Sequence, residues 1–88
     1  MTNTNNLVEA VRKMDIDPYQ RIALAIVAQA IQDYTALSRR ADRTPAQERE
    51  RIACREFILS DRFVLYTSGQ VDGQGLLNRL DQKISSGN

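Results

Sequence analysis

Apolar residues recur along the chain at the spacing of an α-helix, and polar or proline-containing stretches separate the apolar runs. The first run predicts a short helix over residues 6–14, with apolar side chains at Leu7, Val8, Val11 and Met14. The second run is the longest. Because Asp17 and Pro18 are the residue types of an N-cap and a first helical position, we expect a second helix from Pro18 to about Arg40.

Two adjacent apolar stripes run along the surface of the second helix, so that its N-terminal half is apolar nearly all round. One stripe consists of Ile22, Ile26 and Ala30, and the other of Ala23, Val27, Ala30, Tyr34, Leu37 and Ala41. Such a helix belongs at the centre of a bundle. Ala25 and Ala28 lie on the side away from Val27 and Tyr34 and would let another helix approach closely, so we expect a homodimer or higher homo-oligomer.

A third helix is predicted to begin at Thr44-Pro45, because Gln47 completes the pattern of a capping box with a proline in the first turn. The apolar positions predict which side of this helix faces inward. The expected inner residues are Ala46, Ile52, Ala53, Phe57 and Leu59, and the expected outer residues are Glu48, Arg51 and Arg55.

Two shorter elements complete the pattern. Ser60-Asp61 has the residue types of a helix end followed by a new N-cap. This pattern predicts a short helix or turn over residues 63–66 that ends at Gly69. Asp72 is expected to cap a last helix from Gly73 to about Ile84. The inward side chains of that helix are expected to be Leu76, Leu77, Leu80 and Ile84.

The pattern therefore predicts an all-α fold, a single domain over residues 1–88 built as a bundle of about four to five helices. Two longer helices are followed by a short helical corner, and residues 1–5 and 85–88 are expected to be frayed termini. The only run with strand propensity, residues 63–66, has no second strand to pair with. A domain of this size buries roughly 60% of the surface of its unfolded chain, so the core is thin.

Charge is balanced over the chain but uneven along it. Twelve basic residues stand against eleven acidic ones, which argues against general attraction to nucleic acid or anionic lipid. Residues 39–55 nevertheless carry six arginines against three acids. This stretch is interpreted either as a solvated helix surface, which the interleaved acids favour, or as a phosphate-binding site. Its candidate partner-binding residues are Arg39, Arg40, Arg43, Arg51 and Arg55.

Residues with catalytic or metal-binding side chains are scarce. The chain has no histidine and one cysteine, which removes the usual catalytic triads and most zinc sites. We therefore expect no enzyme activity, no metal site and no cofactor. Cys54 is expected to be a buried or half-buried structural thiol. The glycines at positions 69, 73 and 75 do not form a phosphate loop, because the preceding strand and the Gly-Lys-Ser/Thr motif are missing. We expect these glycines to lie in turns of the chain.

No apolar run is long enough to span a bilayer, since the longest extends only from Ile22 to Ala28. The single cysteine and the polar, uncharged first residues predict a cytoplasmic protein without a secretory signal. The most distinctive surface candidate is the stretch from Ser60 to Tyr66. Arg62, Phe63 and Tyr66 would supply an aromatic and arginine cluster for a partner. Alternatively, the two rings complete the core and Arg62 pairs with a nearby acid; the core role is favoured for Phe63, and both roles stay open for Tyr66 because its hydroxyl needs a polar partner.

Four segments resemble a group of small all-helical proteins of bacteriophages and prophages. They are IVAQAIQDY at 26–34, REFILSDRF at 55–63, VDG at 71–73 and LLNRL at 76–80. The resemblance implies a phage origin and a compact helical fold. That group has no established activity, so the resemblance implies no site residue.

Three functions follow as hypotheses. The first is a phage accessory protein that inhibits a host defence system, such as a CRISPR effector, by binding a host protein or an immune nucleotide signal in the host cytoplasm. The second is a nucleic-acid-binding regulator that grips phosphates with residues 39–55 and uses the last helix as a helix-turn-helix variant. The third is a structural or assembly component.

Overall fold

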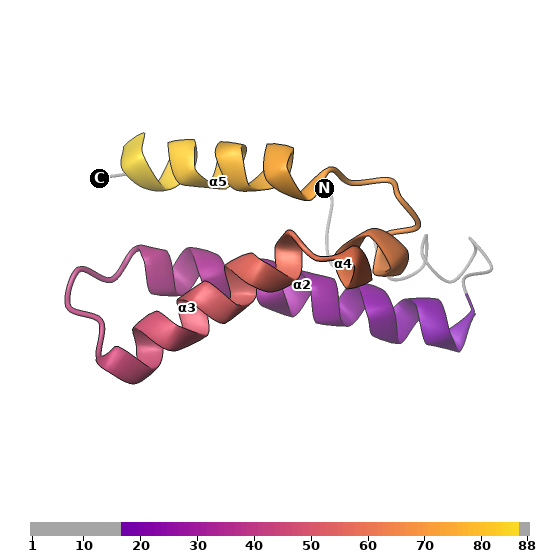
Figure 1. The fold of residues 1–88 in the computed structure, drawn as a ribbon, viewed down its shortest axis with the longest axis horizontal. Coiled ribbons are helices and arrows are strands. Elements are labelled where there is room, and N and C mark those ends of the chain that lie inside the picture. The colour runs from indigo at the N-terminus through magenta and orange to yellow at the C-terminus, as the bar shows by residue number, and fades with distance from the viewer. Residues whose placement is uncertain (1–16, 87–88) are drawn as a thin grey trace, which may run out of the picture.

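The computed structural model describes residues 17–86, and this part of the chain is all-helical (Figure 1). Its four helices are α2 (Pro18–Ser38), α3 (Pro45–Ile58), α4 (Asp61–Tyr66) and α5 (Gly73–Ser86). The all-α prediction is confirmed, while the helix predicted over residues 6–14 lies outside the described residues. In Figure 1, α3 returns along the C-terminal half of α2, α4 lies at the N-terminal half, and α5 runs in the same direction as α2.

Local capping explains where α2 begins and ends. The Asp17 carboxylate accepts a hydrogen bond from the Gln20 amide at 2.9 Å, as an N-cap does. At the other end the helix stops at Ser38, two residues before the predicted end, because the Arg43 guanidinium turns back onto it. Arg43 Nη1 donates to the carbonyl oxygens of Leu37, Ser38 and Arg40 at 3.0, 3.4 and 2.7 Å. Carbonyls at and just after a helix C-terminus need such partners, although the Leu37 carbonyl also accepts from the Arg40 amide at 3.2 Å.

The predicted capping box at the start of α3 is confirmed. Thr44 Oγ1 accepts from the Gln47 amide at 3.1 Å, and the Gln47 side chain accepts from the Thr44 amide at 3.0 Å. Ser60 caps α4 by accepting from the Phe63 amide at 3.4 Å. After α4 the chain reverses through Ser68 and Gly69, whose φ angles of 55° and 70° lie in the left-handed region.

The first turn of α5 is capped as predicted, since the Asp72 carboxylate accepts from the Gly75 amide at 3.1 Å. The helix extends to Ser86, beyond the predicted end at Ile84. Its last described residue donates a hydrogen bond from the Ser86 hydroxyl to the Gln82 carbonyl at 2.8 Å, which supports the extra turn. Ser85 and Ser86 are therefore helical rather than frayed.

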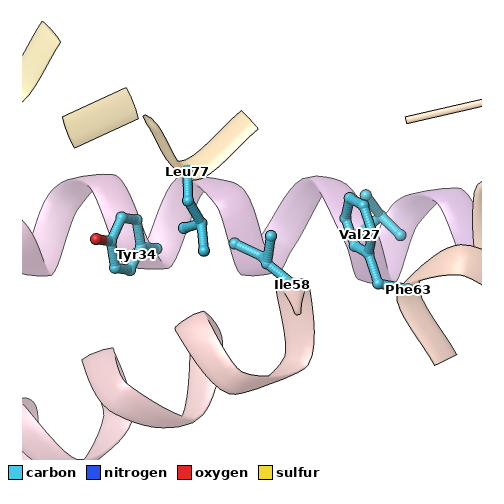
Figure 2. Packing of buried hydrophobic residues seen from close by; sticks show 5 residues of the cluster. All are labelled: Val27, Tyr34, Ile58, Phe63 and Leu77. Atoms are coloured by element: carbon cyan, nitrogen blue, oxygen red, sulfur yellow. The ribbon is translucent and has the colours of Figure 1, made fainter. Parts of the chain in front are cut away.

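One small cluster of buried side chains joins all four helices. Val27 and Tyr34 come from α2, Ile58 from α3, Phe63 from α4 and Leu77 from α5 (Figure 2). Figure 2 shows these side chains in a row along α2. The cluster confirms the core role expected for Phe63 and, from the second stripe of α2, for Val27 and Tyr34, whereas Ala41 is exposed and lies beyond the end of the helix.

Two predicted faces differ from the structure. The first stripe of α2 is not covered, because Ile22 and Ile26 are exposed. On α3 the predicted inner residues Ala46, Ile52, Ala53 and Leu59 are exposed as well. Arg51 and Arg55, predicted to face outward, are half-buried on the side of the helix that carries the buried Ile58. The prediction was wrong because an arginine can bury its aliphatic stem while its guanidinium pairs with an acid.

The start of α5 packs so closely on the end of α3 that only glycine fits at position 73. A Cβ atom there would collide with the backbone carbonyl oxygen of Ile58, whereas a Cβ at Gly75 would meet only the Asp72 carboxylate, at 2.9 Å. We expect Gly73→Ala to lower the free energy of unfolding by about 2–3 kcal/mol through overpacking. Gly75→Ala should change it by less than about 1 kcal/mol, because the helix propensity of alanine offsets the loss of the Asp72 cap when that side chain rotates away.

Urea unfolding of the two variants and the wild type measures this difference. Equal stability of the Gly73→Ala and Gly75→Ala proteins would contradict the close approach of α5 to α3.

Candidate interaction surface

The arginines of residues 39–55 are divided between solvent and internal ion pairs. Arg39 and Arg40 are exposed just after α2. Arg40 Nε lies 3.9 Å from the Asp42 carboxylate, and both side chains are exposed, so this ion pair contributes little. Both arginines therefore lie on the protein surface, as predicted. The described residues around them form no ligand site.

Glu48 brings two of the candidate arginines together. Arg43 Nε donates to Glu48 Oε1 at 2.6 Å, and Arg51 donates to both carboxylate oxygens, from Nη2 at 2.7 Å and from Nε at 3.0 Å. Hydrogen bonds from Arg51 and then Arg43 lower the pKa of Glu48 from its usual 4.5 to about 2. The same contact with Glu48 raises the pKa of Arg51. This triad fastens the α2–α3 connection to α3.

A second polar link joins α5 to the other long helices. The Tyr34 hydroxyl donates to Asp81 Oδ1 at 2.6 Å, and Arg55 Nη1 lies 3.8 Å from Asp81 Oδ2. A cavity of about 170 Å³ lies beside these groups. It is lined by Tyr34, Ser38, Arg43, Arg51, Asp81, Ile84 and Ser85. The arginines at this end of the molecule therefore hold helices together, and Glu48 and Asp81 offset most of their charge.

The other candidate residues, Arg62 and Tyr66, form an aromatic cluster with α3. The Arg62 guanidinium carbon lies 5.9 Å from the centre of the Phe57 ring and 5.8 Å from the centre of the Tyr66 ring. These two ring centres are 6.0 Å apart, and Phe57 also meets the buried Phe63 edge-on at 6.1 Å. Arg62 is exposed, but the rings beneath it are tied to the core, so its position is well defined.

Tyr19 belongs to the same surface although it comes from the first turn of α2. Arg62 Nη2 donates to the Tyr66 hydroxyl at 3.4 Å. That hydrogen bond raises the pKa of Arg62, and Tyr19 lies near enough that ionisation of its phenol would raise this pKa slightly further. The Tyr19 side chain is 65% exposed. We call Tyr19, Phe57, Arg62 and Tyr66 the aromatic–arginine surface.

An apolar stripe continues from Tyr19 along α2. Ile22 and Ile26 follow it at the three- and four-residue intervals of one helix face, and Ile22 is 62% exposed. We call Tyr19, Ile22 and Ile26 the α2 stripe. An exposed run of large apolar side chains beside an arginine and several rings has the composition of a binding surface.

A groove lies on the other flank of α2, between this helix and the chain that follows α4. Its volume is about 320 Å³, and its walls are mainly apolar. It is lined by Gln20, Leu24, Val27, Tyr66, Thr67, Ser68, Gln70 and Val71. We call it the α2–α4 groove. Tyr66 belongs to both features, since its ring lines the groove and lies under Arg62.

Cys54 is half-buried on α3, as predicted for a structural thiol. Burial raises the pKa of this thiol, and the charges of Asp33 and Glu50 add to the effect. A raised pKa disfavours the thiolate, which is the nucleophilic form.

Sequence reasoning found half of the aromatic–arginine surface. Arg62 and Tyr66 are brought together as predicted, but Tyr19 and Phe57 were missed. Tyr19 could have been found from the sequence, because it lies three residues before Ile22 on the same helix face. It therefore lengthens an apolar stripe that a small bundle cannot cover completely. Phe57 was assigned to the core, and its half-buried ring lies at the edge of it.

Comparison with protein-family models, with curated proteins and with solved structures gave no match. Phage origin and family therefore stay predictions. None of the helices within residues 17–86 is both long enough and apolar enough to cross a bilayer.

Stability should depend on pH through Glu48. A carboxylate whose pKa is lowered on folding stabilises the fold above its unfolded-state pKa, and the stabilisation is lost as the pH falls. For Glu48 the loss of this stabilisation begins near pH 4.5 and is complete below about pH 2. Urea unfolding between about pH 6 and pH 2 should therefore show a steeper loss of stability for the wild type than for Glu48→Gln.

Glu56→Gln is the matched control, because Glu56 is an exposed carboxylate on the same helix. Its profile should follow the wild type. A Glu48→Gln profile parallel to the wild type down to pH 2 would show that the Arg43–Glu48–Arg51 triad does not form in solution.

Proposed function

We propose that this chain is a non-enzymatic protein that acts by binding another protein through the aromatic–arginine surface and the α2 stripe. The observation that carries the proposal is the position of Arg62, which is exposed and lies over two rings that are anchored to the core. Tyrosine and arginine dominate binding energy at protein interfaces. Because the cluster is already ordered, little side-chain entropy remains to be lost on binding.

The charges favour a protein over a nucleic acid as the partner. Affinity for nucleic acid depends on several cations contacting phosphates. In the most basic stretch, Arg43, Arg51 and Arg55 lie against Glu48 and Asp81. The net charge of the chain is +1. The α2 stripe adds uncharged apolar surface, which suits a protein partner and offers nothing to a phosphate backbone.

The resemblance to phage proteins supports a more specific form of the proposal, inhibition of a host defence protein in the cytoplasm of the host. A small protein can inhibit by occupying a functional surface of its target and needs no catalytic group. Homo-oligomer formation stays part of the proposal, and the exposure of Ala25 and Ala28 on α2 is compatible with it.

Substitutions on the proposed surface should weaken target binding without unfolding the chain. A target protein captured from an immune-competent host is purified, and its affinity for the wild type is compared with that for Arg62→Ala and for Tyr19→Ala. Each substitution should weaken binding by about 2 kcal/mol, roughly 30-fold in Kd. Both side chains are exposed, so circular dichroism should show unchanged helicity.

Arg49→Ala is the matched control, because Arg49 is an exposed arginine on α3 outside the proposed surface. Its affinity should equal that of the wild type. Equal affinities for Arg49→Ala, Arg62→Ala and Tyr19→Ala would contradict the proposed surface. Salt-sensitive binding to DNA in place of a protein would favour the nucleic-acid hypothesis.

A further inference from the structure

The exposed large apolar residues of α2 all lie in its N-terminal half. They are Tyr19, Ile22, Leu24 and Ile26. From Val27 to the end of the helix, every large apolar side chain is buried or half-buried. Of these residues, Leu24 lies on the flank of α2 opposite the α2 stripe, where an occupant could cover it without covering Tyr19, Ile22 or Ile26.

The α2–α4 groove supplies a concave surface on that flank. Buried Val27 and Thr67 lie at its base, and Leu24, Tyr66 and Val71 form apolar walls. Leu24 and Val71 are exposed although both are large and apolar. The polar lining residues are neutral, so the groove favours an uncharged apolar occupant.

We propose that the α2–α4 groove is the docking site of residues 7–14 of the same chain. These residues precede the described part, and only residues 15–17 separate them from α2. A connection of this length is typical between neighbouring antiparallel helices. Eight helical residues span roughly 12 Å, which is also about the distance along α2 from Tyr19 to Val27. The length of the segment thus matches the part of α2, from Gln20 to Val27, that lines the groove.

The side-chain pattern of the segment suits the groove. At helical spacing its large apolar residues share one face, which consists of Leu7, Val8, Val11 and Met14. The charged residues Glu9, Arg12 and Lys13 fall on the opposite face. Docking by the apolar face therefore buries no charge, and it covers Leu24 and Val71.

Docking also connects the groove to the aromatic–arginine surface. Tyr66 contributes to both, so an occupied groove fixes the ring under Arg62. Residues 7–14 would then help to shape the partner-binding surface. This last consequence rests on the proposed function, whereas the docking itself does not.

The test is methyl nuclear Overhauser spectroscopy on the full 88-residue chain. Cross-peaks are expected from Val11 and Met14 methyl groups to those of Leu24 and Val71. A mixture of isotope-labelled and unlabelled chains distinguishes contacts within one chain from contacts between two. Intermolecular cross-peaks would overturn the proposal in favour of a second copy in the groove, and the absence of cross-peaks would overturn it outright.

A pair of variants gives an independent readout. Val11→Asn places an amide on the apolar face and should shift the methyl signals of Leu24 and Val71. Lys13→Asn changes the opposite face and should leave those signals in place. Equal effects of the two variants would contradict docking. Neither variant alters a residue of the aromatic–arginine surface, so failure of docking and failure of partner binding are separate results.

Discussion

The burial of Phe63 is the interaction on which the rest of the fold depends. Its ring is fully buried, and its cluster draws side chains from all four helices of the described chain. The helix that carries it has six residues, too few to be stable alone, so packing and the Ser60 cap hold it in place. The Thr67 hydroxyl, also buried, donates to the Phe63 carbonyl at 2.9 Å and secures the end of the same helix. The position of Phe63 thereby fixes the helix face on which Arg62 and Tyr66 lie together.

A core of this size leaves apolar side chains uncovered. In the described part of the chain six hydrophobic residues are buried, whereas nine large hydrophobic residues are exposed. The excess lies mainly at one end, on the first turns of α2, on α4 and on the chain after it. The opposite end is closed by ion pairs and hydrogen bonds around Glu48 and Asp81. This division gives Arg43, Arg51 and Arg55 a structural role and leaves the apolar end for binding.

Local sequence signals predicted the helices well, because a cap depends on residues three or four positions apart. Asp17, Thr44, Ser60 and Asp72 were each recognised in this way. The inner face of α3 was predicted wrongly, since arginines were assigned to the outer face, and for Arg55 the pairing acid comes from another helix. Asp81 is 26 positions after Arg55 in sequence, and nothing local relates them. The same limit applies to the interaction surface, where Tyr19 lies near Arg62 only through the tertiary fold.

The central claim is that the fold depends on a few buried side chains, and that neighbouring apolar residues are left for binding. Unfolding measurements on Phe63→Ala and Leu65→Ala test it most directly, because these residues share a helix but differ completely in burial: Phe63 is 0% exposed and Leu65 is 68% exposed. Phe63→Ala should lower the free energy of unfolding by about 3–5 kcal/mol, or prevent folding. Leu65→Ala should change it by less than about 0.5 kcal/mol. Comparable losses from the two substitutions would contradict the account.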